Sequence, residues 1–283
     1  MMQEKYSAIR TLQISLLSLS CLLAYYKVGS AQPSTVVYSL QENIPGQYIY
    51  FTTDKLKRIY AVTADNELIQ FDSNAKELFR YNNNTLGTLA YIDTANPFNL
   101  LLFYPEFQTV IILDRTLSPT AELNLLSTEV GDAAAVALSN NNQLWVYDAA
   151  NLQLKKLNAK GEVLLSSGDL SLGLPSPPQA KQIVASADKV YLNDPSLGLI
   201  VFNNFGQYLQ MLPIQNITYF QVFEQQLIYR LKNGKLYSYN LQSLLTIPLD
   251  LPQQTIQSTC LNIQPGLLYF LETNGINICL LKE

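Results

Sequence analysis

The stretch Leu68–Leu78, with the sequence LIQFDSNAKEL, consists of two apolar runs separated by a short polar break. The apolar runs predict two β-strands, and the DSNA between them predicts a tight turn. This turn begins at an aromatic residue followed by Asp72. Four further pairs of an aromatic residue or Leu with Asp or Asn follow along the chain: Leu113-Asp114, Leu157-Asn158, Phe202-Asn203 and Tyr239-Asn240. The successive intervals are 42, 44, 45 and 37 residues, so short strands repeat with a period near forty.

The repeated turns have a defined chemistry. An Asp or Asn at the first position accepts a hydrogen bond from the backbone N–H two residues on, and a Gly three residues later supplies positive φ for a type I turn closed by a G1 bulge. The turns Asn158 to Gly161 and Asn203 to Gly206 have both features. Asp72 to Ala75 and Asn240 to Ser243 replace the Gly by a small residue, and Asp114 to Leu117 keeps only the acid. We interpret these segments as hairpins, because one acid per turn is too few for a calcium loop.

A second series of turns repeats in the same phase, between the second and third strands of each predicted repeat. It includes Asn233-Gly234 and Asn274-Gly275, whose glycines are 41 residues apart. Asn-Gly is the strongest short signal for a type I′ hairpin. Together the two series predict an all-β chain, folded as a six-bladed β-propeller of four-stranded antiparallel blades.

The sixth predicted repeat is one strand short. Its strands are Gln257–Asn262, Leu267–Leu271 and Ile276–Leu281. An unpaired last strand would expose an edge that promotes aggregation. The segment Thr35–Leu40, TVVYSL, is rich in β-forming residues and precedes the first full repeat. We expect it to pair with Ile276–Leu281, so that an N-terminal strand closes the ring.

The first 31 residues differ in character from the rest. Lys5 and Arg10 precede the apolar run Leu12 to Tyr26, and Gly29-Ser30-Ala31 places small residues where a signal peptidase cleaves. We expect a signal peptide at residues 1–31 and one propeller domain at 32–283, exported to the periplasm or the outer membrane, with no membrane span in the mature form. Two alternatives stay open, a retained membrane anchor and a lipoprotein that begins at Cys21.

The composition restricts the chemistry. Hydrophobic residues make up 48% of the chain and charged residues 14%, and there is no His. The absence of His excludes Ser-His-Asp and Cys-His catalysis, and the chain has neither a P-loop nor a dinucleotide fingerprint. Without a long basic run, no nucleic acid partner is predicted. Cys260 and Cys279, on strands of the last repeat that we expect to be neighbours, are either two buried free thiols or a disulfide, which an exported protein permits.

The connections between repeats are irregular, and irregular loops on a rigid scaffold usually carry binding. The connection Ser167–Ala180 is the longest, and its Leu residues would be costly to expose without a partner. The predicted partner surface consists of Leu170, Leu172, Leu174, Pro175, Pro177 and Pro178, with Tyr104 and Phe107 at its rim. The alternative is that these Leu side chains fold back onto their own blades and that the aromatic pair clamps its own hairpin.

The repeats, with turns of the form [aromatic or Leu]-[Asp or Asn]-x-x-[Gly or small], resemble six-bladed propellers of the NHL and YWTD kind over roughly Thr35 to Glu283. The leader ending in Ala31-Gln32 and the body rich in Tyr, Asn and Leu also resemble uncharacterised exported propeller proteins of Bacteroidota. Low charge, the absence of His and the abundance of Tyr favour a non-catalytic scaffold without a cofactor that binds a protein partner in the cell envelope. The resemblance to exported propellers implies that this scaffold serves an outer-membrane assembly or secretion machine.

Calcium-dependent lactonases and sugar dehydrogenases also use six-bladed propellers. The alternative function is therefore a hydrolase that acts on a small lactone or sugar. Its calcium would be held at the mouth of the channel by Asp93, Asp132 and Glu224, or these three residues are solvated loop acids.

Overall fold

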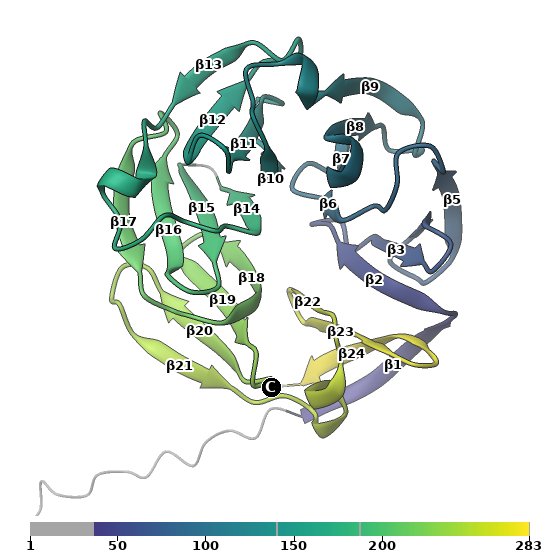
Figure 1. The fold of residues 1–283 in the computed structure, drawn as a ribbon. Helices are drawn as coiled ribbons and strands as arrows, with labels where there is room; N and C mark the ends of the chain where they lie inside the picture. Colours follow the sequence, from purple (N-terminus) through teal and green to yellow (C-terminus); the bar gives the residue numbers. More distant parts are fainter. Residues whose placement is uncertain (1–36, 140, 187, 283) are drawn as a thin grey trace, which may run out of the picture. The chain divides into compact units, whose positions relative to one another are not determined.

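The computed structural model describes residues 37–139, 141–186 and 188–282. They form six sheets of four antiparallel strands arranged in a ring, which is a six-bladed β-propeller (Figure 1). The predicted fold class is confirmed. The predicted signal peptide and Cys21 lie outside the described residues. Within the described ranges, no helix is both long enough and apolar enough to span a membrane.

Five blades follow one another along the chain, and each uses its strands in sequence order from the channel outward. The first blade comprises β2 (Tyr48–Thr53), β3 (Ile59–Thr63), β4 (Glu67–Phe71) and β5 (Glu77–Asn82). The second comprises β6 (Tyr91–Asp93), β7 (Leu100–Tyr104), β8 (Thr109–Leu113) and β9 (Pro119–Asn124). The third comprises β10 (Ala133–Leu138), β11 (Leu144–Asp148), β12 (Gln153–Leu157) and β13 (Val163–Ser166). The fourth comprises β14 (Gln182–Ala185), β15 (Lys189–Asp194), β16 (Gly198–Asn203) and β17 (Tyr208–Leu212). The fifth comprises β18 (Ile217–Phe223), β19 (Gln226–Leu231), β20 (Leu236–Asn240) and β21 (Thr246–Leu249).

The sixth blade joins the two ends of the described chain. It consists of β22 (Leu261–Gln264), β23 (Leu267–Glu272), β24 (Gly275–Lys282) and, as its outer strand, β1 (Val37–Pro45). The ladder between β1 and β24 runs from the pair Val37–Lys282 to the pair Pro45–Gly275, with a bulge after Leu40. The predicted closure by an N-terminal strand is confirmed, and the strand continues beyond the predicted end at Leu40.

The predicted turn chemistry is present in the hairpins between the third and fourth strands. The first turn residue accepts a hydrogen bond from the N–H two residues on, at 2.8 to 3.0 Å, in all five blades that follow one another along the chain. In four of these blades the fourth turn residue has positive φ and the ladder shifts by one residue, as a G1 bulge requires: Ala75, Leu117, Gly161 and Gly206. The fifth blade differs because its turn is longer, and positive φ falls on Leu244.

The core lies between neighbouring blades. Trp145 of β11 and Phe202 of β16 belong to the apolar cluster between the third and fourth blades, and both are fully buried. The ammonium of Lys156 lies 5.0 Å from the centre of the Trp145 ring, a cation–π contact. Because a blade is covered on both faces, its second and third strands are buried along most of their length.

Two expectations about the sixth blade are wrong. Its first strand begins at Leu261, since the short 3-10 helix η4 (Gln253–Gln257) occupies part of the segment predicted as strand. Cys260 and Cys279 also do not lie on neighbouring strands, because β23 separates β22 from β24. Both thiols are free, with Cys279 buried and Cys260 half-buried.

Candidate functional site

The first strands of the blades line a central channel with two chambers. We call the end of the ring that carries the blade-to-blade connections and the turns between second and third strands the upper end. The upper chamber, of about 420 Å³, is lined by the starts of the inner strands, and the lower chamber, of about 340 Å³, by their ends. Five residues line both chambers and are called the shared ring: Tyr50, Tyr91, Gln182, Tyr219 and Cys260.

The shared ring consists of groups that are uncharged at neutral pH. Burial raises the pKa of the Tyr50, Tyr91 and Tyr219 hydroxyls and raises the pKa of the Cys260 thiol to about 12. The thiol donates to the carbonyl oxygen of Phe51 at 3.0 Å. Because the thiolate is the nucleophilic form of cysteine, Cys260 is held in the unreactive state.

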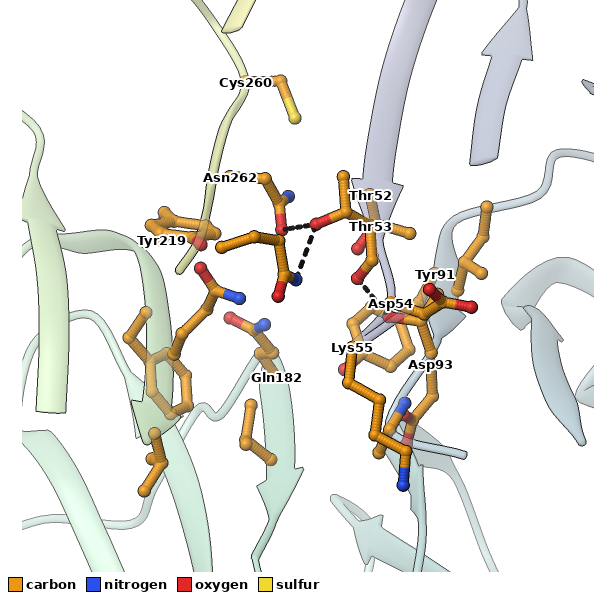
Figure 2. Close-up of a pocket in the computed structure, with 18 of the residues that line it drawn as sticks. Thr52, Thr53, Asp54, Lys55, Tyr91, Asp93, Gln182, Tyr219, Cys260 and Asn262 are labelled. Carbon is orange, nitrogen blue, oxygen red and sulfur yellow. Dashed lines mark hydrogen bonds between the residues drawn. The ribbon is translucent and has the colours of Figure 1, made fainter. Parts of the chain in front are cut away.

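Acids of the lower chamber bind the protein's own backbone and side chains. Figure 2 shows Gln182, Tyr219, Cys260 and Asn262 across the opening from Thr52, Thr53, Asp54, Tyr91 and Asp93. Asp54 accepts from Arg58 Nε at 2.7 Å and from the Tyr60 hydroxyl at 3.0 Å. Thr53 Oγ1 donates to Asn262 Oδ1 at 3.1 Å and links the first blade to the sixth (Figure 2). The acids of this chamber thus hold the first blade and its neighbours in register.

The three acids proposed as calcium ligands do not meet. Asp132 precedes β10 at the upper end, whereas Asp93 and Glu224 follow or end inner strands at the lower end. The two carboxylate oxygens of Asp93 accept from the N–H groups of Ala95 at 2.8 Å and Leu138 at 2.7 Å, and burial raises the pKa of this acid despite these bonds. In the part of the chain that the structure describes, no three His, Cys, Asp or Glu residues cluster as a metal site would require. The expectation that these acids converge is wrong, because the starts and the ends of the inner strands lie at opposite mouths.

The long connection between β13 and β14 divides its apolar residues between core and surface. Leu170 is buried in the cluster between the third and fourth blades, and Leu174 packs against the same cluster. Leu172 is 87% exposed. Pro175 and Pro177 are exposed, whereas Pro178 is buried. Two of the three Leu residues therefore fold back, and the accessible part of the predicted surface narrows to Leu172 and the two exposed prolines.

Both ends of this connection are fixed. The short 3-10 helix η3 (Leu170–Leu172) begins where the Asp169 carboxylate accepts from the Ser171 N–H at 2.8 Å, and the Leu170 N–H donates to the carbonyl of Leu152 at 2.9 Å. At the other end, the Gln179 N–H donates to the Asp194 carboxylate, and the Tyr147 hydroxyl donates to the carbonyl of Pro178. The segment between these hydrogen bonds is therefore attached at both ends to the third and fourth blades.

Of the two aromatic residues predicted at the rim of the surface, one is exposed and one is buried. Phe107 lies in the short 3-10 helix η1 (Pro105–Phe107) and is 49% exposed. Tyr104 is fully buried in the cluster between the first and second blades, so its expected place at the surface is wrong. It ends β7, a second strand with both faces covered, and burial extends to the last residue of that strand.

Three polar residues that line the upper chamber were not predicted as site residues: Lys181, Asn193 and Arg230. Asn193 and Arg230 lie in second strands whose other residues are mostly apolar and buried. A polar residue in an otherwise apolar strand could have indicated such a site from the sequence, because the desolvation cost of burying it needs a compensating partner.

No family model matches the sequence, and no curated protein matches it either. Among solved structures, a streptogramin B lyase superposes with a TM-score of 0.57 at 10% identity, over 87% of this chain and 98% of that chain. The β-propeller domain of Cps50 (Swd1) from Myceliophteria thermophila superposes with a TM-score of 0.60 at 13% identity, over 87% of this chain and 100% of that chain. At these identities the likeness establishes the class, a β-propeller, and nothing about activity.

Proposed function

We propose that this protein is an exported, non-catalytic β-propeller that binds a protein partner in the cell envelope. The partner contacts the upper end of the ring, centred on Leu172. The observation that carries the proposal is the 87% exposure of this Leu in a connection whose flanking residues are anchored. A large apolar side chain on a rigid frame is a typical anchor for a partner, because binding removes it from water without ordering a loop.

The neighbouring connections support this choice of face. The short 3-10 helix η2 (Leu125–Ser127) follows the same design as η3, with Leu125 fully buried and Leu126 exposed. Phe107 of η1 is exposed at the same end, and the Leu125 N–H donates to the carbonyl of Gln108 directly after η1 at 2.7 Å. One turn within the second blade and the connections that follow the second and third blades therefore each present one exposed apolar side chain at the upper end.

The non-catalytic part of the proposal rests on the channel. The shared ring offers tyrosine hydroxyls and a thiol that burial keeps protonated, and neither supplies a base near neutral pH. The lactonase-like alternative needs acids that converge on one mouth, and Asp93, Asp132 and Glu224 lie at different ends. The cell-envelope location rests on the leader sequence, and service to an outer-membrane assembly or secretion machine rests on the resemblance to exported propellers of Bacteroidota.

The experiment compares partner recovery with matched surface variants. Tagged wild type, Leu172→Ser and Leu245→Ser are expressed in the native cell, cross-linked, and purified from the envelope fraction. Leu245 is 64% exposed and lies at the lower end, in the turn between β20 and β21, so its replacement controls for lost surface hydrophobicity. We expect Leu172→Ser to lose a partner that wild type and Leu245→Ser retain. Equal recovery by all three folded proteins would place the binding face elsewhere, and absence of the protein from the envelope fraction would contradict the location.

A further inference from the structure

The upper chamber has the size and lining of a small-molecule site. Its volume of about 420 Å³ falls in the range of ligand pockets. Phe103, Pro105 and Pro195 give it apolar walls, and the tyrosines of the shared ring form its inner boundary with the lower chamber. It is separate from the Leu172 surface, which lies on the outside of the connection between β13 and β14.

The charges that line this chamber have one sign. Arg230 is 6% exposed, and its guanidinium donates to the carbonyl oxygens of Ser258 at 2.7 Å and Thr255 at 2.9 Å. These bonds position the guanidinium, which stays protonated and positively charged in proteins. Lys181 adds an exposed ammonium. Among the described residues that line the upper chamber there is no carboxylate, whereas Asp54 and Asp93 line the lower one.

Asn193 supplies an acceptor in the same lining. It is 4% exposed, and its Nδ2 donates to the carbonyl oxygen of Ile217 at 3.4 Å, across the boundary between the fourth and fifth blades. In this orientation the amide directs Nδ2 to that carbonyl and Oδ1 away from it. Its Oδ1 is buried and has no hydrogen-bond partner among the described residues. A buried acceptor without a donor is unfavourable, so a ligand that brings a hydroxyl or N–H gains by occupying it.

We propose that the upper chamber binds a small carboxylate that also carries a hydroxyl donor and an apolar group. The carboxylate lies in the positive field of Arg230 and Lys181. The hydroxyl donates to Asn193 Oδ1. The apolar group lies against Phe103 and the two prolines.

Three probes test the chemistry, each titrated calorimetrically into the mature protein at millimolar concentration. Phenyllactate has all three features, phenylpropionate lacks the hydroxyl, and phenylpropanol lacks the carboxylate. We expect phenyllactate to bind, phenylpropionate to bind about tenfold more weakly for want of the donor, and phenylpropanol to show no binding. Failure of phenyllactate to bind, or equal binding by phenylpropionate or phenylpropanol, would overturn the proposal.

Two charge-reversal variants test in which chamber the ligand binds. Lys181 and Lys55 are both exposed, and they line the upper and the lower chamber respectively. Lys181→Glu should lower the affinity for phenyllactate about tenfold, because it reverses a charge beside the site. Lys55→Glu should change this affinity by no more than about twofold, because Lys55 lines the other chamber. Both variants should keep the fold, since neither ammonium is buried. A larger loss with Lys55→Glu would assign the ligand to the lower chamber and contradict the inference.

Discussion

Leu40 lies opposite Cys279 in the ladder that joins the first described strand, β1, to the last, β24. Two segments from the ends of the propeller domain thus share one sheet. The closing strand also contributes to the core, because Ile44 is buried in a cluster with Phe51 and Ile59 of the first blade. Ring closure therefore depends on apolar packing as well as on the backbone hydrogen bonds of the ladder.

Removal of the closing strand should destabilise the whole ring. A chain that begins at Gln47 lacks β1, exposes the edge of β24 and loses the burial of Ile44. We expect its free energy of unfolding to fall by about 4 kcal/mol or more, with a broader thermal transition. Circular dichroism melts of this chain and of the chain that begins at Gln32 measure the difference. Coincident melts would show that β1 is dispensable for closure.

Gly275 is the position at which a single added methyl group should force the closure apart. Its φ is +138°, and a Cβ there would lie 2.1 Å from the backbone carbonyl oxygen of Ile44. We expect Gly275→Ala to lower the free energy of unfolding by about 3 kcal/mol, because neither backbone can move without breaking the ladder. Gly266→Ala is the control, since Gly266 also has positive φ, +76°, but a Cβ there meets nothing within 4 Å. Equal losses in urea unfolding would mean that backbone strain alone, without the clash, explains the effect.

The repeated turn allows opposite substitutions at equivalent positions. Ala75 and Gly206 both occupy the fourth turn residue, with φ of 62° and 74°. Ala75→Gly should raise the free energy of unfolding by about 0.5 kcal/mol, and Gly206→Ala should lower it by about 1 kcal/mol, since only Gly adopts this conformation without strain. The nearest atoms to a Cβ at Gly206 lie 3.8 Å away, so no clash confuses the comparison. Chemical denaturation of both variants checks the two signs, and changes of the same sign would contradict this account of the turn.

The fold could be predicted because its determinants are local. The hydrogen bond from Asn74 N–H to Asp72 and its equivalents involve residues two apart, so each turn is encoded where it forms. The beginning of the sixth blade could not be predicted in this way. The segment that includes η4 is held by Arg230, which donates to Thr255 and Ser258, 25 and 28 residues further along the chain. Hydrophobic pattern alone gives no sign of such a contact.

The candidate site was predicted less completely, for a related reason. Leu170 and Leu172 are the same residue type two positions apart, and only the packing of η3 against the third and fourth blades buries one and exposes the other. Asp93 and Asp132 both looked like acids at a channel mouth, but the direction of the strand beside each acid decides which mouth. Sequence indicated the connection on which we place the proposed surface, but it could not assign which of its side chains are buried and which are exposed.

A buried ion pair should give the protein a distinct sensitivity to acid. Lys155 Nζ lies 2.7 Å from Asp148 Oδ2, and both side chains are almost completely buried. Burial by itself raises the pKa of Asp148, but hydrogen bonds from Lys155, Asn151 and two backbone N–H groups outweigh it and hold the pKa at about 2. The folded protein thus keeps this carboxylate ionised at a pH where the unfolded chain, with a pKa near 3.8, is protonated. The resulting stability is fully present above pH 3.8 and is lost as the pH falls toward 2, and it amounts to about 2 kcal/mol.

Urea unfolding at a series of pH values between 5 and 2 measures this contribution. Asp148→Asn should flatten the loss of stability over that interval. At neutral pH it should cost about 3 kcal/mol, because Lys155 is then buried without a counter-charge. Asp65→Asn is the control, since Asp65 is an exposed acid in the turn between β3 and β4 whose carboxylate is screened by solvent, and its pH profile should follow that of the wild type. If Asp148→Asn kept the wild-type slope between pH 4 and 2, the acid sensitivity would belong to other carboxylates.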